Sequence, residues 1–397
     1  MTKMNEAPRR RARDLGIQVG VLPTGAWNAI TDVHGVKVGH QTIRDGDRVH
    51  TGVTVIVPHD ENVFQQKVPA AVCVGNGYGK MTGIAQVREL GNIESPIALT
   101  NTLNVFAALE GLVRYTLAQP GNESVTSVNA IAGETHDGRI SDIRGLHVKA
   151  DHVLAALASA KSGAVEEGCV GAGTGTWCLG FKGGIGTASR RVASDDGAYT
   201  VGVLVQSNYD GILTINGAPV GREFTTATKA AATPASGDGS CMIVVATDAP
   251  LDARNLERLA KRALMGLART GSVMDNGSGD FVIAFSTAYR IAANVGLLNP
   301  PVALVSNNHM NALFLAAAEA TEEALYNSLR WQQPGQSVDE YLQQYFALVN
   351  KLFDGEWNKY IMGKDFKPFD IDDRLENGVN PKAQSPKLKI VKNNDES

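Results

Sequence analysis

Metal-binding and disulfide-forming patterns are missing from the sequence. Its four cysteines, at positions 73, 169, 178 and 241, do not form a CxxC pair, and its eight histidines show no HExxH or similar spacing. Structural zinc sites and disulfide frameworks depend on such spacings. We therefore expect no metal site and no disulfide framework.

Long apolar runs and a strong charge of one sign are also absent. No run approaches the ~20 apolar residues that a membrane helix needs. The first residues, MTKMNEAPRRRARDLG, are basic but lack the apolar segment of a secretory signal. With 37 Lys and Arg against 41 Asp and Glu, the formal charge is only -4. This balance argues against nucleic acid or an anionic membrane as the main partner. The absence of a recognisable secretory signal leads us to expect a cytoplasmic location.

Glycine, in contrast, is abundant: the chain has 42 glycines in 397 residues, above the usual share of about 7%. Two segments concentrate them, GNGYGK (75–80) and GAGTGTWCLGFKGGIGTASR (171–190). Neither fits the phosphate-loop or dinucleotide-binding patterns. We interpret them as tight turns and close packing near a pocket, and expect no cofactor. The absence of GxSxG also disfavours an α/β-hydrolase.

Apolar segments alternate with helical patterns, which predicts an α/β protein. The expected strands cover residues 52–58, 68–75, 199–208, 241–247 and 281–287. The expected helices cover residues 102–117, a segment capped by Asp151 that runs through 152–161, the buried stripe of 256–267, and 309–329.

The chain changes character after Arg330. Ser337 and Glu340 form a capping box before YLQQYFALVNKLF, which predicts one more helix. Residues 371–397 are polar and charged, as is typical of disordered segments. We expect a C-terminal extension over residues 331–397.

A low-complexity stretch ends where a core strand begins. Residues 225–239, TTATKAAATPASGDG, cannot build a core, so we expect a mobile surface loop. The next strand would hold Ser240 firmly while the loop leaves the Gly239 carbonyl accessible to its hydroxyl. Attack there moves the acyl group from nitrogen to oxygen, and water then releases the loop. The new chain begins at Ser240, whose α-amine, with a pKa near ~7.7, is a built-in general base. Gly–Ser pairs are common at such junctions, so the feature alone does not establish self-cleavage.

A collinear series of segments carries more specific information. It comprises ARDLGI, GAWNAITDVHGVKVGH, GETHDGRISDIRG, GAGTG…FKGGIGTASR, YTVGVLVQSN, GSCMIVVATDAPLDARNLERLAKRALMGLARTGS, SGDFVIAFST and AAEATEEAL. Together they resemble the β-peptidyl aminopeptidase and D-aminopeptidase (L-aminopeptidase D-amidase/D-esterase) family of self-processing serine peptidases. The resemblance covers roughly residues 12–330, and the tail from about Trp331 does not share it.

The resemblance implies an αββα layered sandwich with the logic of N-terminal-nucleophile hydrolases. It implies one catalytic domain over residues 1–330, cut at Gly239–Ser240 into chains 1–239 and 240–397. The cut enzyme would release N-terminal residues from small peptides, amides or esters through an acyl-enzyme on Ser240, without a cofactor. We expect the two chains to associate as a homotetramer of heterodimers. The preference for β-, small L- or D-residues is left open.

The same resemblance assigns roles to five further residues. Asn208 of VQSN would donate to the oxyanion, as an amide aimed where negative charge develops. Ser278 and Asp280 of SGD would lie beside the nucleophile, although some relatives carry Glu in place of Asp280. Glu134 of GETHDG would receive the substrate's ammonium. His136 stands where some relatives use a Tyr hydroxyl on the oxyanion, and its N–H could donate instead.

Other interpretations stay open at this point. Glu134 and Asp280 could be salt-bridge partners, Ser278 a turn residue and Asn208 a strand-end cap. Cys241 is a rival nucleophile, but alternation along the strand points it away from the Ser240 face, into the core. The chain could instead be an acyltransferase resembling ornithine acetyltransferase, although those enzymes use Thr at the cut site, or a non-catalytic binding protein of the same fold.

Overall fold

The computed structural model describes residues 10–194, 197–222, 239–294 and 301–329. All of them belong to the first of two compact units, which spans residues 1–342. The loop predicted for residues 225–239 lies outside these ranges except for Gly239, which is not in a loop but begins a strand. The helix and tail predicted after Arg330 also lie outside the described residues.

One sheet has four strands in the order β1-β2-β5-β6. Strands β1 and β2 form an antiparallel hairpin, and β5 runs parallel to β6. The bounds are β1 Lys37–Asp45, β2 Val49–Val57, β5 Ile97–Asn101 and β6 Ile131–Thr135.

The second sheet has seven strands in the order β13-β3-β12-β11-β10-β9, with β4 pairing β3 outside this path. Strand β11 pairs antiparallel with β10 and parallel with β12. The bounds are β3 Gln66–Gly77, β4 Asn92–Ile93, β9 Ile185–Ser194, β10 Gly197–Asn208, β11 Gly239–Thr247, β12 Ser278–Ser286 and β13 Ile291–Ala292. A separate small hairpin joins β7 Trp177–Cys178 and β8 Phe181–Lys182.

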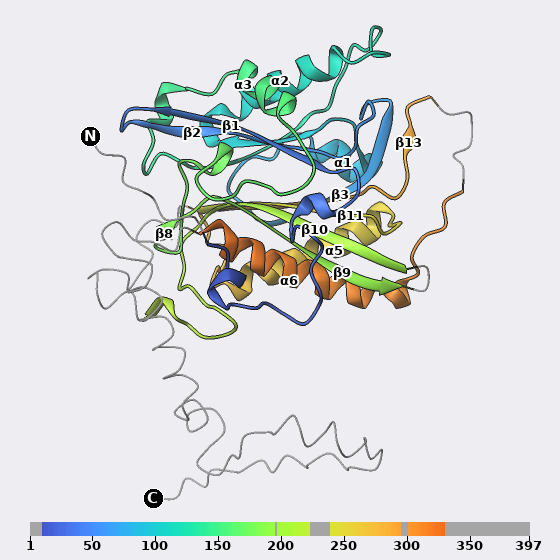
Figure 1. The fold of residues 1–397 in the computed structure, drawn as a ribbon. Helices are drawn as coiled ribbons and strands as arrows, with labels where there is room; N and C mark the ends of the chain where they lie inside the picture. The colour runs from blue at the N-terminus through green and yellow to red at the C-terminus, as the bar shows by residue number, and fades with distance from the viewer. Residues whose placement is uncertain (1–9, 195–196, 223–238, 295–300, 330–397) are drawn as a thin grey trace, which may run out of the picture. The chain divides into compact units, whose positions relative to one another are not determined.

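Helices cover both outer faces of the stacked sheets, so the predicted αββα layering is confirmed (Figure 1). Helices α2 and α3 pack on the four-stranded sheet, and α5 and α6 on the seven-stranded sheet. The bounds are α1 Ile84–Leu90, α2 Val105–Leu117, α3 Ala150–Ala158, α5 Ala253–Arg269 and α6 Met310–Ser328. Every strand and helix predicted within the described ranges is present, with ends shifted by a few residues.

The predicted cap of α3 was wrong. Lys149, not Asp151, is the N-cap residue, and Asp151 lies in the first turn. The His152 ring nitrogen accepts the Lys149 backbone N–H at 3.0 Å, which satisfies the donor at the helix entry. In α5 the N-cap Asp252 accepts the Asn255 N–H at 2.8 Å, a common stabilising cap.

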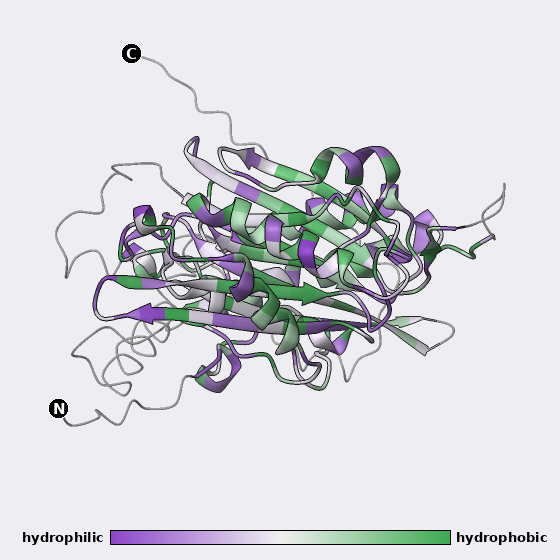
Figure 2. Ribbon diagram, turned by 90° about the horizontal axis from the view of Figure 1, so that it is seen from above, coloured by the Kyte–Doolittle hydropathy of each residue, from purple (hydrophilic) through white to green (hydrophobic). Residues whose placement is uncertain are grey.

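Apolar side chains fill the layer between the sheets. Strands alternate their side chains, so Met242 and Val244 of β11 contact the inter-sheet cluster with Leu99. Ile243, which lies between them in sequence, is fully buried on the helix side. In Figure 2 hydrophobic colour runs along the strands, and hydrophilic colour gathers in turns and on exposed faces. Strand β11 is therefore buried along its whole length between β12 and β10.

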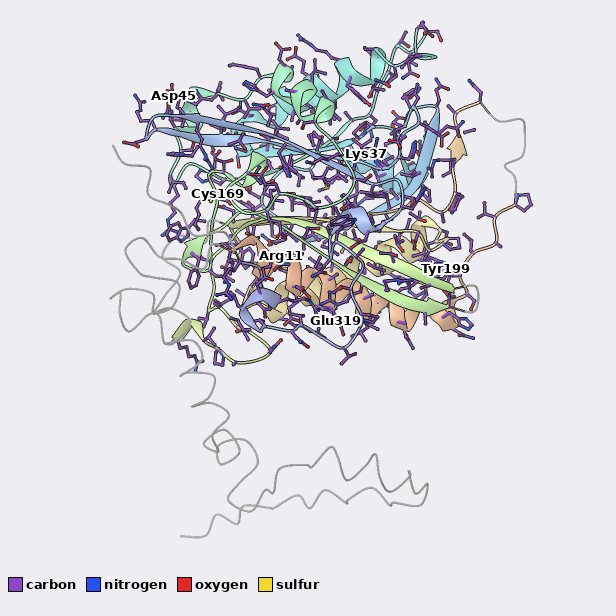
Figure 3. All side chains as sticks on the ribbon, viewed as in Figure 1. Arg11, Lys37, Asp45, Cys169, Tyr199 and Glu319 are labelled. Atoms are coloured by element: carbon purple, nitrogen blue, oxygen red, sulfur yellow. The ribbon has the colours of Figure 1, made fainter. Side chains whose placement is uncertain are left out.

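A buried ion cluster ties α6 to β9. Arg190 of β9 is fully buried and bonds Glu319 at 3.1 Å and Glu323 at 2.7 Å. Glu319, labelled in Figure 3, also accepts the backbone N–H of Val21, and Arg13 pairs with Glu323 at 2.7 Å. The cluster therefore anchors the N-terminal segment, the seven-stranded sheet and α6 to one another.

Candidate active site

Ser240 is the second residue of β11 and is almost completely buried. The chain is continuous through it, and its hydroxyl donates a hydrogen bond to the Gly239 carbonyl oxygen. On one side it pairs with Asn208 of β10, and on the other it lies beside Gly279 of β12. The hydroxyl is therefore held against the carbonyl that self-cleavage would attack.

Asn208 faces Ser240 directly across the antiparallel pair. Residues opposite each other in such a pair share a face of the sheet. The Asn208 Oδ1 accepts the backbone N–H of Trp177, in the β7–β8 hairpin, at 2.9 Å. Since its oxygen is bonded to Trp177, the amide presents its NH₂ group as the end left to donate. An NH₂ group on the face of Ser240 can stabilise a negative oxygen there.

Ser278 and Asp280 approach the junction from the other face of the sheet. The register pairs Asp280 with Cys241 and Ser240 with Gly279. Because side chains alternate along both strands, Asp280 and Ser240 face opposite sides of the sheet. A methyl group added at Gly239 would lie 3.2 Å from the Ser278 hydroxyl oxygen. Ser278 thus borders Gly239, and Asp280 lies on the same face beside Cys241, while the Ser240 side chain points to the opposite face.

These two side chains are buried without hydrogen-bond partners among the described residues. This holds for the Ser278 hydroxyl oxygen and for both carboxylate oxygens of Asp280. Burial raises the pKa of Asp280 from 3.8 to about 6; the nearby Ser278 hydroxyl offsets part of this effect and the charge of Asp275 adds to it. Buried polar groups are nearly always bonded, and among the described residues the Ser278 hydroxyl is the only side-chain donor that acts on Asp280, so the carboxylate can accept a further donor.

Glu134, at the end of β6, is buried and fully engaged. Its Oε1 accepts the Lys80 backbone N–H at 2.9 Å and the Lys80 ammonium at 3.2 Å. Its Oε2 accepts the Thr102 hydroxyl. The carboxylate is therefore fixed in place, and its one cationic partner among the described residues is a lysine whose side chain is 40% exposed.

Three contacts bring Glu134 near Ser240. A methyl group at Gly79 would lie 3.4 Å from the Glu134 Oε1 and 3.1 Å from the Gly279 Cα, and Gly279 pairs with Ser240. The residues flanking Glu134 meet the same strands: Gly133 packs close to the Met242 side chain. The Gln206 side chain of β10 donates to the hydroxyl of the following Thr135 at 2.8 Å.

His136 is not drawn into this cluster. Its side chain is exposed, and the ring folds back over Gly138, where an added methyl group would lie 2.8 Å from the ring Cε1. Within the described residues its ring makes no hydrogen bond to Ser240 or Asn208.

The glycine-rich segments pack against other backbone near the site. A methyl group at Gly173 would lie 2.4 Å from the Ile185 nitrogen, and one at Gly183 would lie 2.6 Å from the Ser207 carbonyl oxygen. Only glycine fits such contacts, which agrees with the close packing expected from the sequence. Among the described residues no group of three His, Cys, Asp or Glu side chains could hold a metal ion. None of the helices in this part of the chain has both the length and the apolar character required to cross a membrane.

Cys241 does not compete with Ser240 as nucleophile. It is fully buried on the helix side of β11, and burial, reinforced by the nearby Asp280 charge, raises the pKa of its thiol well above the usual value. The reactive thiolate is therefore disfavoured.

The sequence reasoning missed Lys80, Thr102 and Trp177. Lys80 ends the GNGYGK segment, which had been interpreted only as a turn near a pocket. Thr102 follows β5, a strand that the sequence analysis does not predict, and Trp177 lies within the second glycine-rich segment. Their contacts with Glu134 and Asn208 depend on long-range packing, which no local pattern signals.

Comparisons with known proteins agree on one family. Residues 28–340 match peptidase family S58. The chain is 42% identical over 343 residues to the beta-peptidyl aminopeptidase BapA of Sphingosinicella microcystinivorans, covering 80% of this chain and 85% of that protein.

Solved structures show the same similarity. A beta-aminopeptidase from Burkholderia sp. superposes with a TM-score of 0.73 and 45% identity, over 80% of this chain and 91% of that one. The L-aminopeptidase D-Ala-esterase/amidase of Ochrobactrum anthropi superposes with a TM-score of 0.74 and 38% identity, over 80% and 90% of the two chains. That protein is described as a prototype for the serine aminopeptidases and a new variant among the Ntn hydrolase fold.

Proposed function

The chain belongs to peptidase family S58, and from this premise we propose that it activates itself by cleavage at Gly239–Ser240 and then uses Ser240 as its nucleophile. It is a hydrolase with aminopeptidase function. The proposal concerns the cut, the residues that carry the chemistry and the kind of N-terminal residue released.

The cleavage step follows from the contact between the Ser240 hydroxyl and the Gly239 carbonyl. The hydroxyl oxygen attacks the carbonyl carbon, the C–N bond breaks, and the hydroxyl proton passes to the departing nitrogen. The resulting ester is hydrolysed by water. The products are chain 1–239, ending in the Gly239 carboxylate, and chain 240–397, beginning with a free α-amine and a regenerated hydroxyl.

The observation that carries the proposal is the unpaired cluster of Ser278 and Asp280 beside this bond. An amide nitrogen within a strand has one hydrogen to donate, whereas the amine released by cleavage has two, or three when protonated. The new amine can therefore donate to the Ser278 oxygen and the Asp280 carboxylate. These residues would hold the amine that serves as general base to the Ser240 hydroxyl.

The remaining residues complete an acyl-transfer site. Asn208 donates its amide N–H to the oxyanion formed when Ser240 attacks the substrate carbonyl. Glu134 accepts the substrate's N-terminal ammonium, and its burial strengthens that interaction. His136 would contribute to the oxyanion only if its exposed ring turned inward. By analogy with the relatives, we expect peptides, amides or esters that begin with a β-amino acid or a small L- or D-residue.

Self-cleavage is tested by comparing the wild type with Ser240→Ala. Mass spectrometry of the wild type should show two chains, the second beginning Ser240-Cys241-Met242. The Ser240→Ala protein should remain one chain and be inactive. An uncut wild type with full activity would contradict the mechanism.

The role of Glu134 is tested with one amide substrate in free and N-acetylated form. Acetylation removes the ammonium and adds bulk, so the wild type should barely cut the capped form. Glu134→Gln should lose about tenfold to a hundredfold in kcat/KM on the free amine, and should discriminate less against the capped form. An equal loss on both substrates would make Glu134 structural.

The amine base predicts a pH dependence. The rate should rise with pH through the pKa of the Ser240 amine, near ~7.7 when unperturbed; burial would lower this pKa and an ionised Asp280 would raise it. A rate that is flat from about pH 5 to 9 in single-turnover measurements would argue against an amine base.

Two alternatives are less well supported. An acyltransferase resembling ornithine acetyltransferase is not favoured, because the comparisons agree on peptidases. A non-catalytic binding protein would give one band, not two, on denaturing electrophoresis. The division into a catalytic domain over residues 1–330 and an extension over 331–397, the homotetramer of heterodimers and the cytoplasmic location stay predictions; the mass of the native protein tests the assembly.

A further inference from the structure

The carboxylate assigned to the substrate's ammonium already has a cation. Lys80 places both its backbone N–H and its ammonium on the Glu134 Oε1, and Thr102 occupies Oε2. A substrate ammonium that binds Glu134 must share this carboxylate with the Lys80 ammonium. The site as folded is therefore not a simple anionic pocket for an amine.

Two ammonium groups on one carboxylate repel each other at close range. The Lys80 side chain is 40% exposed, so it can move aside, but it then loses its partner. A substrate that brings an anion next to its own ammonium removes this conflict. Its ammonium binds Glu134, its anion binds Lys80, and the four charges alternate in sign.

We infer that Lys80 makes the site selective for N-terminal residues that carry a carboxylate on the carbon bearing the ammonium, and in particular for β-linked aspartyl residues. In such a residue the ammonium and the α-carboxylate share one carbon, so they can meet two groups that are themselves in contact. The β-carbonyl, which forms the amide to be cut, extends from the same carbon toward Ser240. This inference names the substrate class of the site described above and rests on the proposed function.

Gly79 allows the carboxylate of Glu134 to lie close to the strands that carry Ser240 and Gly279. It lies between Glu134 and Gly279, the residue that pairs with Ser240. Even a methyl group there would be in close contact with both, so a larger side chain would not fit. The acyl group of a β-amino acid is one carbon further from its amine than that of an α-amino acid. The head group can thus stay at Glu134 and Lys80 while the carbonyl reaches the Ser240 strand.

A second cation near the site is a poorer candidate for this role. Arg139 stacks on the Trp177 ring at 4.7 Å and pairs with Asp210 at 3.8 Å. Its partner Trp177 is hydrogen-bonded to Asn208, so Arg139 is linked to Asn208 and not to Glu134. Arg139 therefore offers a matched control for a positive charge near the site that does not contact Glu134.

The test uses three p-nitroanilides with the same leaving group: β-alanyl, β-aspartyl with a free α-carboxylate, and β-aspartyl with the α-carboxylate converted to carboxamide. The carboxamide keeps the shape and removes the charge. We expect the wild type to prefer the carboxylate over the carboxamide in kcat/KM by about threefold to thirtyfold, the range for a charged contact that is partly exposed. The preference should appear mainly in KM and should shrink with added salt.

The variants locate the source of the preference. Lys80→Met should abolish it, and should speed cleavage of the β-alanyl substrate because the competing ammonium is gone. Lys80→Arg should keep most of it, since a cation remains, and Arg139→Met should keep it fully. A wild type that cuts the β-alanyl amide but does not distinguish carboxylate from carboxamide overturns the inference and leaves the proposed function intact. So does a preference that survives Lys80→Met. If the wild type cuts none of the three amides, the inference fails; the proposed function fails with it only if L-alanyl and D-alanyl p-nitroanilides are not cut either.

Discussion

The protein buries two clusters of polar and charged side chains that differ in how many of their hydrogen bonds are made. In the cluster of Arg190, Glu319 and Glu323, the guanidinium bonds both carboxylates, and backbone N–H groups and Arg13 complete their coordination. In the cluster of Ser278 and Asp280, no side-chain oxygen has a hydrogen-bond partner among the described residues. Arg190, Ser278 and Asp280 belong to the seven-stranded sheet and the two glutamates to α6, and neither cluster is exposed.

The first cluster has its charges paired, as an anchor requires, whereas the second holds the carboxylate to which the proposed function gives a chemical role. A buried ion with every bond made is stable in the uncut chain and only anchors segments. A buried carboxylate without a partner is unfavourable in the uncut chain, and a donor that appears later would stabilise it. Under the proposed function, that donor is the amine of Ser240, released next to the Ser278 hydroxyl at Gly239.

The largest effect is expected from breaking the paired cluster. In the uncut Ser240→Ala background, Arg190→Met leaves Glu319 and Glu323 buried without their shared cation and should lower the free energy of unfolding by about 3–5 kcal/mol. Urea denaturation followed by circular dichroism measures this. The control is Arg114→Met, which removes an exposed pair with Glu110 and should cost less than about 1 kcal/mol. Equal effects would show that the buried cluster is not an anchor.

The next largest effect is on reaction rates, and we expect it from substitutions in the cluster of Ser278 and Asp280. Asp280→Asn and Ser278→Ala should each slow both processing and turnover, by about a hundredfold where proton transfer depends on the held amine. Processing is followed by electrophoresis of freshly purified protein, and turnover with a β-alanyl amide. Normal rates in both variants, with normal folding, would make these residues structural.

The smallest effect is a difference in how stability responds to pH. The raised pKa of Asp280 means that its contribution to the stability of the uncut chain is present below the unfolded pKa of 3.8 and is lost as the pH rises through about 6. Glu323 has the opposite sign. Burial alone would raise its pKa, but Arg13 and Arg190 lower it, so its contribution is lost as the pH falls through that lowered pKa.

In the Ser240→Ala protein, Asp280→Asn should therefore remove a decline in unfolding free energy of about 2 kcal/mol between about pH 4 and pH 7. The loss on the acid side should remain. An unchanged pH profile after Asp280→Asn would show that the carboxylate finds a partner in the uncut chain.

The sequence predicted the elements well because they depend on local periodicity, whereas the layers came from the family resemblance. The stripe of α5 and the apolar strand after Ser240 are readable within a few residues. The predicted cap of α3 was wrong because the helix begins two residues earlier than expected, where the His152 ring accepts the N–H of the N-cap residue Lys149.

The geometry of the site was less predictable. Alternation along β11 correctly placed Cys241 in the core, but the matching alternation along β12, which puts Asp280 on the Cys241 face, requires knowledge that the two strands pair in register. The contact of Lys80 with Glu134 depends on residues 80–82 following β6 after leaving the other sheet, since Thr82 donates to Ala132 at 2.8 Å. No local pattern encodes that course.

The strand order determines whether the two chains of the cut enzyme could separate. Strands β11 and β12 would belong to the second product, and both of their neighbours, β10 and β3, to the first. The two polypeptides would be interleaved, so neither could leave without dismantling the central sheet. The uncut chain folds as one molecule, but once cut and denatured the halves must find each other in solution, a step that depends on concentration. The mature enzyme would then persist because its unfolding is slow and poorly reversible, and a purification tag on either end would recover both chains in equal amounts.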